Sequence, residues 1–525
     1  MKRTILILSF AILGLSTNAQ IEFQKTYGGA SYDYGFCAQQ TTDGGYIVAG
    51  STNSYGAGGY DIYLIKTNAA GDTLWTKTYG GAATDWVNSV KQTADGGYII
   101  TGYVHSFGAG GADVYLIKTN AAGDTLWSKT FGGVMDDYGY VALQTFDGGY
   151  IVSARAKSFG AGNTDVYLIK TNPNGDTTWT KTYGGGGADA GYAIQQTLDS
   201  GYIIAGTTAS FGAGGNDIYL IKTNSSGDTL WSRTYGGTGD DQGFGVQQTT
   251  DGGYIVAGMT TSYGTGSYDV VLIKTNSMGD TLWSKTYGGG GDDEGWGVQQ
   301  TTDGGYIVTG YTSSFGAGGY DVYLIKTNSS GTAIWSKAYG GTGNDYGNSV
   351  QQTTDRGYII TGQTNSFGAG GGDVYLIKTD SLGASGCNQN NAATVTSSCP
   401  FTVTHPNTQI HYGGIVTSPP TQIGFGGIVS TPCTTVGIEE MANGVSVSIY
   451  PNPFSSSATL LINGETKDNL YLYIYDLLGQ EVKSMFIGNQ KEVTIDRDNL
   501  VGGMYFYRIM GRNNEVVGMG KVIVE

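Results

Sequence analysis

Carboxylates at fixed spacing are the first chemistry that this sequence offers, because aspartate recurs at three places in a unit of 52 residues. The first set follows a Gly-Gly pair and comprises Asp33, Asp85, Asp137, Asp189, Asp241, Asp293 and Asp345. The second set opens an apolar stretch and comprises Asp61, Asp113, Asp165, Asp217, Asp269, Asp321 and Asp373. The third set lies in a Gly-rich turn and comprises Asp43, Asp95, Asp147, Asp199, Asp251, Asp303 and Asp355.

These aspartates could bind calcium or could form turns. The first two sets fall at the same end of consecutive antiparallel strands, and Ca²⁺ prefers six to eight oxygen ligands. The two strands that carry them are, however, about 10 Å apart within one unit. Aspartate also accepts hydrogen bonds from backbone N–H groups in tight turns, which suits identical copies. We therefore expect structural aspartates and no identifiable cofactor, with calcium on the first set as the alternative.

Residues that depart from the repeat on this loop-rich face are the candidates for specific binding. Arg155 and Lys157 are charged where the other units are not. The full set is Tyr32, Trp86, His105, Asp136, Tyr138, Arg155, Lys157, Asp240, Asp292 and Glu294. Aromatic side chains beside carboxylates suit a sugar or a peptide ligand, so we expect an extracellular glycan or protein partner. Sequence drift in loops is the alternative explanation.

Catalysis has little support in the sequence. The histidines are His105, His405 and His411, and two of them lie outside the repeats, which disfavours a Ser–His–Asp site. No spaced His/Cys group indicates zinc. We expect a binding scaffold rather than an enzyme. The alternatives are a glycan hydrolase or lyase that uses Asp136, Asp240, Asp292 and Glu294, and a structural surface protein without a ligand.

The elements that position these residues follow from the repeat itself. Tryptophan recurs every 52 residues at positions 75, 127, 179, 231, 283 and 335, and Phe23 stands at the same place one step earlier. One unit holds four extended segments, for example 87–93, 97–102, 113–120 and 125–131, and shows no helical periodicity. Turn-rich sequences join these segments as hairpins, and four-stranded units repeated at this period indicate a β-propeller.

The strand count predicts how the propeller closes. The first segment of the unit occurs seven times, and the last set, 348–379, has no fourth segment of its own. The matching fourth segment, 21–29, precedes all the others. We therefore expect residues 20–385 to form a monomeric seven-bladed propeller that the N-terminal strand closes.

The two flanks of the repeats predict export and a linker. Residues 1–19 resemble a Sec signal peptide with cleavage between Ala19 and Gln20, and no other segment suits a membrane span. Residues 386–444 are rich in Thr, Ser, Pro and Gly and include a doublet spaced by 13 residues, so we expect a linker or small β module. A Cys399–Cys433 disulfide is expected there, although four cysteines permit three pairings.

The C-terminal residues, 445–525, read as short alternating strands of a small Ig-like β-sandwich. They resemble the type A sorting domain of the type IX secretion system of Bacteroidota. The matching motifs are YPNPF at 450–454, DLLGQ at 476–480, GMY at 503–505 and a final strand from Lys521. The resemblance implies a partnership with the type IX machinery, passage through the periplasm, and release or attachment at the outer-membrane surface.

The repeats resemble secreted bacterial propeller repeats of the SBBP type. The matching residues of one unit are Tyr235–Gly236–Gly237 with Asp241, followed by the strand at 253–258. This resemblance implies architecture rather than activity. The formal net charge of −16, with dispersed basic residues, makes nucleic acid an unsuitable partner.

Overall fold

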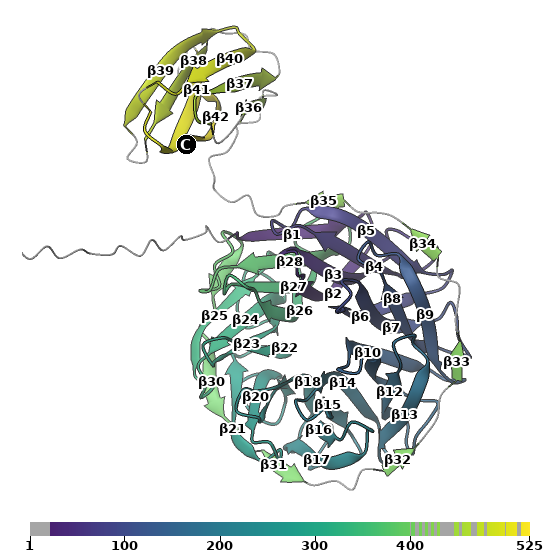
Figure 1. Ribbon diagram of the computed structural model, residues 1–525. Coiled ribbons are helices and arrows are strands. Elements are labelled where there is room, and N and C mark those ends of the chain that lie inside the picture. The colour runs from purple at the N-terminus through teal and green to yellow at the C-terminus, as the bar shows by residue number, and fades with distance from the viewer. Residues whose placement is uncertain are drawn as a thin grey trace, which may run out of the picture. The chain divides into compact units, whose positions relative to one another are not determined.

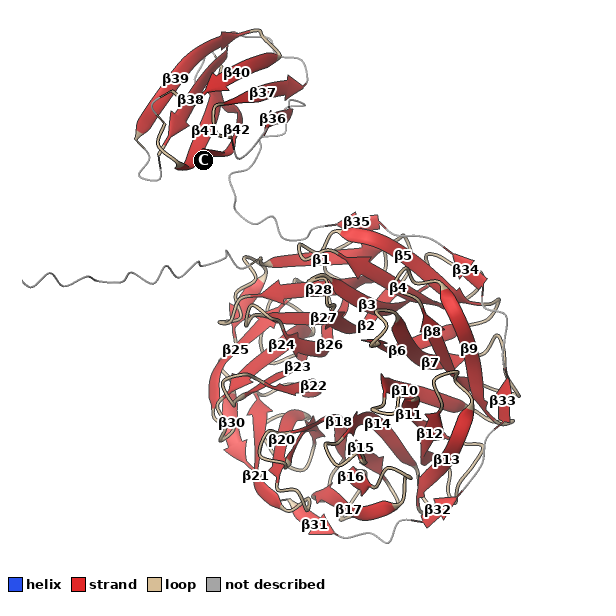
Figure 2. Ribbon diagram, in the orientation of Figure 1, coloured by secondary structure: helices blue, strands red, loops and turns tan. Residues whose placement is uncertain are grey.

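The computed structural model describes residues 21–524 apart from 400, 405–408, 412–414, 418–421, 425–427, 431–445, 451–453, 464–469, 477–479, 499 and 512–515. The predicted cleavage site at Ala19 and Gln20 lies outside these residues. Every regular element among them is a β-strand (Figure 2), which confirms the all-β prediction. The chain divides into two compact units, Met1–Cys433 and Thr434–Glu525.

The first unit contains seven five-stranded antiparallel sheets, and each repeat supplies most of one sheet. The innermost strands are β2 (Asp33–Gln40), β6 (Asp85–Gln92), β10 (Asp137–Gln144), β14 (Asp189–Gln196), β18 (Asp241–Gln248), β22 (Asp293–Gln300) and β26 (Asp345–Gln352). The second strands are β3 (Tyr46–Thr52), β7 (Tyr98–Val104), β11 (Tyr150–Ala156), β15 (Tyr202–Thr208), β19 (Tyr254–Thr260), β23 (Tyr306–Thr312) and β27 (Tyr358–Thr364).

The outer half of each sheet begins with the third strand. The third strands are β4 (Asp61–Thr67), β8 (Asp113–Thr119), β12 (Asp165–Thr171), β16 (Asp217–Thr223), β20 (Asp269–Thr275), β24 (Asp321–Thr327) and β28 (Asp373–Thr379). The fourth strands are β5 (Thr73–Gly80), β9 (Thr125–Gly132), β13 (Thr177–Gly184), β17 (Thr229–Gly236), β21 (Thr281–Gly288), β25 (Ala333–Tyr339) and, for the last sheet, β1 (Phe23–Gly28). β1 pairs with β28, which is the place the sequence predicts for the N-terminal strand.

The core lies between adjacent sheets. β8 (DVYLIKT) is buried along its whole length, as a strand covered on both faces must be. Ile99 and Leu116 of one sheet pack against Val152 and Ile169 of the next in one apolar cluster. Apolar residues therefore face both ways on the second and third strands, and each sheet is stabilised by its two neighbours.

The innermost strands contact one another in chain order, and β26 contacts β2. The seven sheets therefore follow one another around a common centre (Figure 1). Asn348 Nδ2 donates to the Gly35 carbonyl at 2.7 Å, joining the last innermost strand to the first. Asn88 makes the same contact with Gly139 at 2.7 Å between β6 and β10.

The segment after the repeats adds a fifth, outermost strand to every sheet. These short strands are β29 (Gln389–Asn391), β30 (Val395–Ser398), β31 (Thr402–Thr404), β32 (Gln409–His411), β33 (Ile415–Thr417), β34 (Gln422–Gly424) and β35 (Ile428–Ser430). They pair in that order with β25, β21, β17, β13, β9, β5 and β1. Residues expected to form a linker or small β module thus run around the outside of the sheets in reverse order (Figure 1). We call β29–β35 the belt.

The disulfide predicted within this region does not form at Cys399. Cys399 is a buried free thiol that packs against Tyr254 and Val256, and burial raises its pKa to about 11. Cys387 is instead disulfide-bonded, and Cys433 lies outside the described residues. The prediction was wrong about Cys399 because this residue fills an apolar gap between two sheets and the belt.

The C-terminal unit consists of two sheets around one apolar core. The strands are β36 (Ser446–Tyr450), β37 (Ser457–Asn463), β38 (Leu470–Tyr475), β39 (Glu481–Gly488), β40 (Glu492–Asp496), β41 (Gly503–Met510) and β42 (Val516–Val524). The orders are β36-β37-β40 and β39-β38-β41-β42. Leu460 and Ile495 of one sheet pack with Leu472 and Val522 of the other. Motif residues 451–453 and 477–479 lie outside the described residues.

Candidate functional site

The first aspartate set joins two loops in each sheet. Asp33 Oδ2 accepts hydrogen bonds from the Gly29 N–H and the Ser54 hydroxyl, both at 2.7 Å. Asp85 does the same with Gly81 and Ser106, both at 2.7 Å. Each carboxylate therefore holds the loop before its own strand against the loop that leaves the second strand, a role expected of aspartate in turns.

The second set meets the first set of the next sheet rather than that of its own sheet. Gly80 lies between them: a Cβ there would come within 2.1 Å of Asp61 Oδ1 and 2.5 Å of Asp85 Oδ2. Only glycine lets two buried carboxylates approach the same point. Burial, with the neighbouring aspartate adding to it, raises the pKa of Asp61 and Asp113 to about 6. The pKa values of Asp217, Asp321 and Asp373 are also raised to about 6.

The third set forms ion pairs at the opposite end of the sheets. Lys66 Nζ lies 2.9 Å from Asp43 Oδ2, and Lys118 Nζ lies 2.8 Å from Asp95 Oδ2. Burial opposes ionisation here, but hydrogen bonds from Thr41 and Lys66 outweigh it and hold the pKa of Asp43 at about 2. All three aspartate sets thus have protein partners. Among the described residues, no three His, Cys, Asp or Glu side chains gather in a metal-binding arrangement.

Variation between repeats is concentrated in one cross-strand pair, where the innermost strand begins and the second strand ends. The seven pairs are Tyr34–Ser51, Trp86–Tyr103, Tyr138–Arg155, Ala190–Thr207, Gln242–Met259, Glu294–Tyr311 and Tyr346–Gln363. The aspartate that precedes each pair is the same in all sheets. We call these residues the variable pairs, and they give the face an asymmetry that the repeat lacks.

Aromatic rings form a continuous row over three consecutive sheets on this face. Tyr34 lies between Tyr32 and Trp86, with ring centroids 6.1 and 5.6 Å away. Trp86 continues to Tyr103 at 6.4 Å, and Tyr103 meets Tyr138 at 4.5 Å. Tyr60 also packs on Trp86, at 5.1 Å. We call Tyr32, Tyr34, Tyr60, Trp86, Tyr103 and Tyr138 the aromatic row. Its first member is 46% exposed, so the row reaches solvent.

A second group combines carboxylates with aromatic hydroxyls. The Trp296 indole N–H donates to Glu294 at 3.1 Å, and the Tyr320 hydroxyl donates to Asp292 at 3.1 Å. Tyr311 packs against Tyr320 at 5.1 Å. Burial raises the pKa of Glu294 above its usual range, while hydrogen bonds from Tyr311 and Trp296 oppose that shift. We call Asp292, Glu294, Trp296, Tyr311, Tyr320 and Tyr346 the acid–tyrosine cluster.

The remaining candidates from the sequence lie in loops of the same face, and each forms hydrogen bonds with a different part of the protein or is exposed. Asp136 accepts the Ala112 N–H at 3.0 Å, and Asp240 accepts the Asn216 N–H at 2.8 Å, so each caps a neighbouring loop. His105 is exposed, and its ring nitrogen lies 3.0 Å from the Thr84 carbonyl. Lys157 is exposed as well. Asp136 and Asp240 thus belong to separate sheets, and only Asp292 and Glu294 share one group.

The sequence analysis named five members of these two groups, Tyr32, Trp86, Tyr138, Asp292 and Glu294, and missed the others. The missed residues are Tyr34, Tyr60, Tyr103, Trp296, Tyr311, Tyr320 and Tyr346. Four of them, Tyr34, Tyr103, Tyr311 and Tyr346, occupy variable pairs. The signal that could have found them is the residue after the invariant aspartate, together with its cross-strand partner. That signal becomes visible only when the strand register is known.

A β-bulge at one position of every innermost strand produces another aromatic group. In β10 the register shifts between Gly139 and Val141, leaving Tyr140 as the extra residue. Tyr140 packs on Tyr192 at 4.9 Å, and Phe244 stacks on Trp296 at 4.6 Å. The small residue after the bulge packs against the next innermost strand: a Cβ on Gly245 would lie 3.2 Å from the Trp296 carbonyl.

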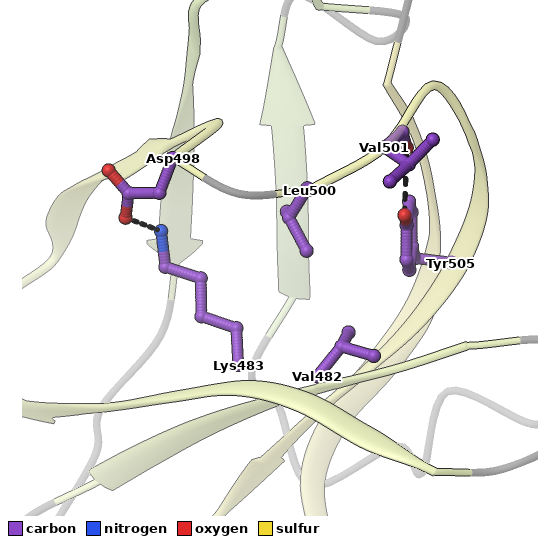
Figure 3. A pocket seen from close by; sticks show the side chains of 6 residues that line it. All are labelled: Val482, Lys483, Asp498, Leu500, Val501 and Tyr505. Carbon is purple, nitrogen blue, oxygen red and sulfur yellow. Dashed lines mark hydrogen bonds and ion pairs between the residues drawn. The ribbon is translucent and has the colours of Figure 1, made fainter.

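The C-terminal unit has a pocket of about 440 Å³. It is lined by Val482, Lys483, Asp498, Leu500, Val501 and Tyr505 (Figure 3). Lys483 Nζ donates to Asp498 Oδ2 at 2.7 Å, and the Tyr505 hydroxyl donates to the Val501 carbonyl at 2.7 Å (Figure 3). These polar groups bond to one another, and we assign the pocket no ligand.

Residues 448–525 match the family of secretion system C-terminal sorting domains. This match indicates export by the type IX route to the cell surface or the extracellular space. No helix that could cross a bilayer occurs in the described part of the chain. No curated protein matches the sequence. Among solved structures, the chain is similar to the extracellular domain of a putative hybrid two-component system from B. thetaiotaomicron, with 9% identity and a TM-score of 0.17 over 95% of this chain and 98% of that chain.

Proposed function

We propose that the exported chain is a monomeric seven-bladed β-propeller that binds a saccharide on its variable face. Seven sheets with one shared strand order, and the contact of β26 with β2, support a closed ring of blades. The likeness of the repeats to SBBP-type propeller repeats supports the same architecture. The sorting domain supports a ligand outside the cell.

The aromatic row is the observation that carries the saccharide proposal. Sugar rings present apolar C–H faces that stack on aromatic side chains, while their hydroxyls bond to nearby polar groups. Trp86 and Tyr34 are half-buried, so each is held by its neighbours and still exposes part of its ring. Rings already fixed by packing lose little conformational entropy on binding. A row over three blades suits a chain of several sugar units.

The arrangement of the carboxylates on this face suits ligand binding better than it suits glycoside hydrolysis. Glycoside hydrolysis needs two carboxyl groups on opposite sides of one bond. Asp136 and Asp240 each cap a loop of a different sheet. Asp292 and Glu294 share one group, but tyrosine and tryptophan side chains already donate hydrogen bonds to them. We therefore assign this pair to the binding face rather than to catalysis.

Replacing Trp86 with alanine tests the proposal. Trp86 contacts Tyr34, Tyr60 and Tyr103, so its loss removes a ring and also loosens the row. We expect affinity for a bound oligosaccharide to fall about 30-fold or more, the effect of losing a central aromatic contact of about 2 kcal/mol. The measurement is titration calorimetry on the mature chain, after a glycan array has identified a binding oligosaccharide.

Two variants serve as matched controls. Gln242 occupies the same register position as Trp86 on β18, so Gln242→Ala should retain affinity. Phe146 is 69% exposed in the turn at the other end of β10, and Phe146→Ala tests whether any exposed ring suffices. Saccharide affinity unaffected by Trp86→Ala contradicts the proposal. Binding of peptides but not glycans to the row assigns the face to a protein partner, and binding of neither favours a structural surface protein.

A further inference from the structure

The cationic end of the aromatic row is Arg155, which lies opposite Tyr138 in the register of β10 and β11. Its guanidinium lies 4.6 Å from the centre of the Tyr138 ring. The equivalent residues of the other sheets are uncharged: Ser51, Tyr103, Thr207, Met259, Tyr311 and Gln363. Arg155 is therefore the one positively charged residue among the seven variable pairs.

Arg155 lacks the partner that buried cations in this fold have. The third-strand lysines each pair with a turn aspartate, as Lys170 does with Asp147 at 2.9 Å. Among the described residues, no carboxylate lies within 4.0 Å of Arg155. Its Nε is buried and has no hydrogen-bond partner. A partly desolvated guanidinium with an unsatisfied donor is costly unless an anion arrives to pair with it.

The surroundings of Arg155 favour an anion from solution over one from the protein. Exposed Lys157 lies on the same loop-rich face, and His105 lies on the neighbouring sheet beside Tyr103, 5.8 Å from its ring centre. Asp136 interacts with the Tyr138 hydroxyl and accepts a hydrogen bond from the Ala112 N–H. The acid–tyrosine cluster, with Glu294 and Asp292, lies on a different sheet, so an acidic ligand group is repelled there and attracted at Arg155.

We infer that Arg155 is the subsite for an acidic substituent of the saccharide, a carboxylate or a sulfate ester. The inference rests on the proposed saccharide function and names the class of sugar. A guanidinium presents N–H donors in a planar fork that matches both groups in two-point contact. A sugar ring stacked on Tyr138 or Tyr103 would bring an acidic substituent to this fork, with the rest of the chain continuing over Trp86.

The experiment compares each acidic ligand with its own neutral form on the mature full chain. Oligogalacturonate and its methyl ester share one backbone and differ in charge, and sulfated dextran and dextran form the second pair. We expect the wild type to prefer the acidic member of at least one pair by about tenfold to a hundredfold in low salt, the range for a charged hydrogen bond. The preference should shrink in high salt.

Arg155→Gln should abolish this preference, so that the acidic and the neutral member of each pair bind with equal affinity. Arg155→Lys keeps the charge without the fork, so part of the preference should remain. Arg233→Gln is the matched control: Arg233 also lies over a ring, Trp231 at 5.4 Å, and its Nε is likewise buried without a partner, but it is on a fourth strand and near Asp280. Thermal midpoints of all variants report whether each chain is folded.

The possible results separate the two proposals. An Arg155-dependent preference in the galacturonate pair assigns the subsite to carboxylates, and one in the dextran pair assigns it to sulfate esters. No acidic preference in the wild type, or a preference that survives Arg155→Gln, overturns the inference. If Trp86→Ala still abolishes binding in that case, the saccharide function stands. If Trp86→Ala has no effect, the proposed function fails as well.

Discussion

Aspartate has three different protonation behaviours in each repeat because its surroundings differ. In the turn, hydrogen bonds from a threonine and a lysine hold the pKa of Asp43 and of Asp95 at about 2. On the third strand, burial and a second carboxylate raise the pKa of Asp217 to about 6. The two environments lie at opposite ends of the same sheets, so pH acts on the two ends in opposite directions.

We expect stability to be highest near pH 4 to 5. The folded pKa of the third-strand aspartates is raised, so their contribution is fully present below the unfolded pKa of about 3.9 and is lost as pH rises through 6. The turn aspartates have lowered pKa values, so their contribution is present above pH 4 and is lost as pH falls towards 2. Urea unfolding at pH 3, 4.5 and 7 measures this dependence.

Asp217→Asn should raise the unfolding free energy at pH 7 by about 1–3 kcal/mol and change it little at pH 4.5. The amide removes a buried charge next to Asp241, and Asp217 Oδ1 has no hydrogen-bond partner to lose. Asp228→Asn is the control, because Asp228 is exposed and pairs with Lys181. Equal gains from both variants, or a loss at pH 7 from Asp217→Asn, would contradict this account.

Removal of divalent cations should leave the thermal midpoint unchanged. The first aspartate set accepts hydrogen bonds from backbone N–H groups and serine hydroxyls, as Asp189 does from Gly185 and Ser210. These contacts use Oδ2 of each carboxylate, and among the described residues no three His, Cys, Asp or Glu side chains gather where an ion that needs six to eight oxygen ligands could bind. The test is differential scanning calorimetry with and without a chelator. A lowered midpoint that calcium alone restores would assign a cation to this set.

At the residue scale the sequence identified about half of the variable face. Trp86, Tyr138 and Glu294 stand out because they differ from neighbouring copies, and all three occupy variable pairs. Tyr103 and Tyr311 were missed because the second strands read as uniform and apolar in the sequence, and only the strand register places these side chains opposite Trp86 and Glu294. A residue that differs from its equivalents in the other repeats can reflect either sequence drift or a binding role. The contacts between aromatic rings in the structure distinguish these two explanations.

The belt is the element that the amino-acid composition of residues 386–444 did not reveal. Its strands occur every six or seven residues, a spacing that spans about 20 Å of extended chain between neighbouring sheets. The doublet of 13 residues therefore covers two sheets per copy: β32 and β33, then β34 and β35. Such short strands have no hydrophobic alternation of their own, so the sequence indicated a linker. Each belt strand forms because it pairs with the exposed edge strand of a sheet, and that edge strand comes from a distant part of the chain.

A chain that ends at Ser385 should be less stable and more prone to associate than one that ends at Cys433. Without the belt, the fourth strands expose unpaired N–H and C=O groups, which are templates for pairing with another chain. Sedimentation velocity over a range of concentrations measures association, and thermal unfolding measures stability. Equal behaviour of the two chains would mean that the belt does not protect these edges.

At the scale of the molecule, removal of residues 445–525 should retain the protein in the periplasm. The sorting domain lies within this segment and folds around its own core, so the unit that holds the repeats should stay intact. Cell fractionation and immunoblotting measure the distribution, with the full chain as the reference. Appearance of the shortened chain in the medium at normal levels would contradict the assignment of the export signal.

Strand number and order in the repeats were predictable because period, turn chemistry and apolar runs agree. The 52-residue period set the unit, and the missing fourth segment at the end of the repeats placed β1 beside β28. The pairing of Asp61 with Asp85 was not predictable, since distances within one unit say nothing about contacts between units. Cys399 was misassigned for the same reason: its neighbours come from two adjacent sheets that are distant from it in the sequence.

The belt has one strand for each sheet, and this matching constrains how the gene can change. Near-identical repeats are prone to unequal recombination, which deletes or duplicates whole units. In this chain such an event would leave a belt strand without an edge, or a sheet without its fifth strand. Because the number of belt strands is fixed by a segment outside the repeats, a chain with more or fewer than seven repeats would lose this match. The belt therefore favours retention of seven repeats.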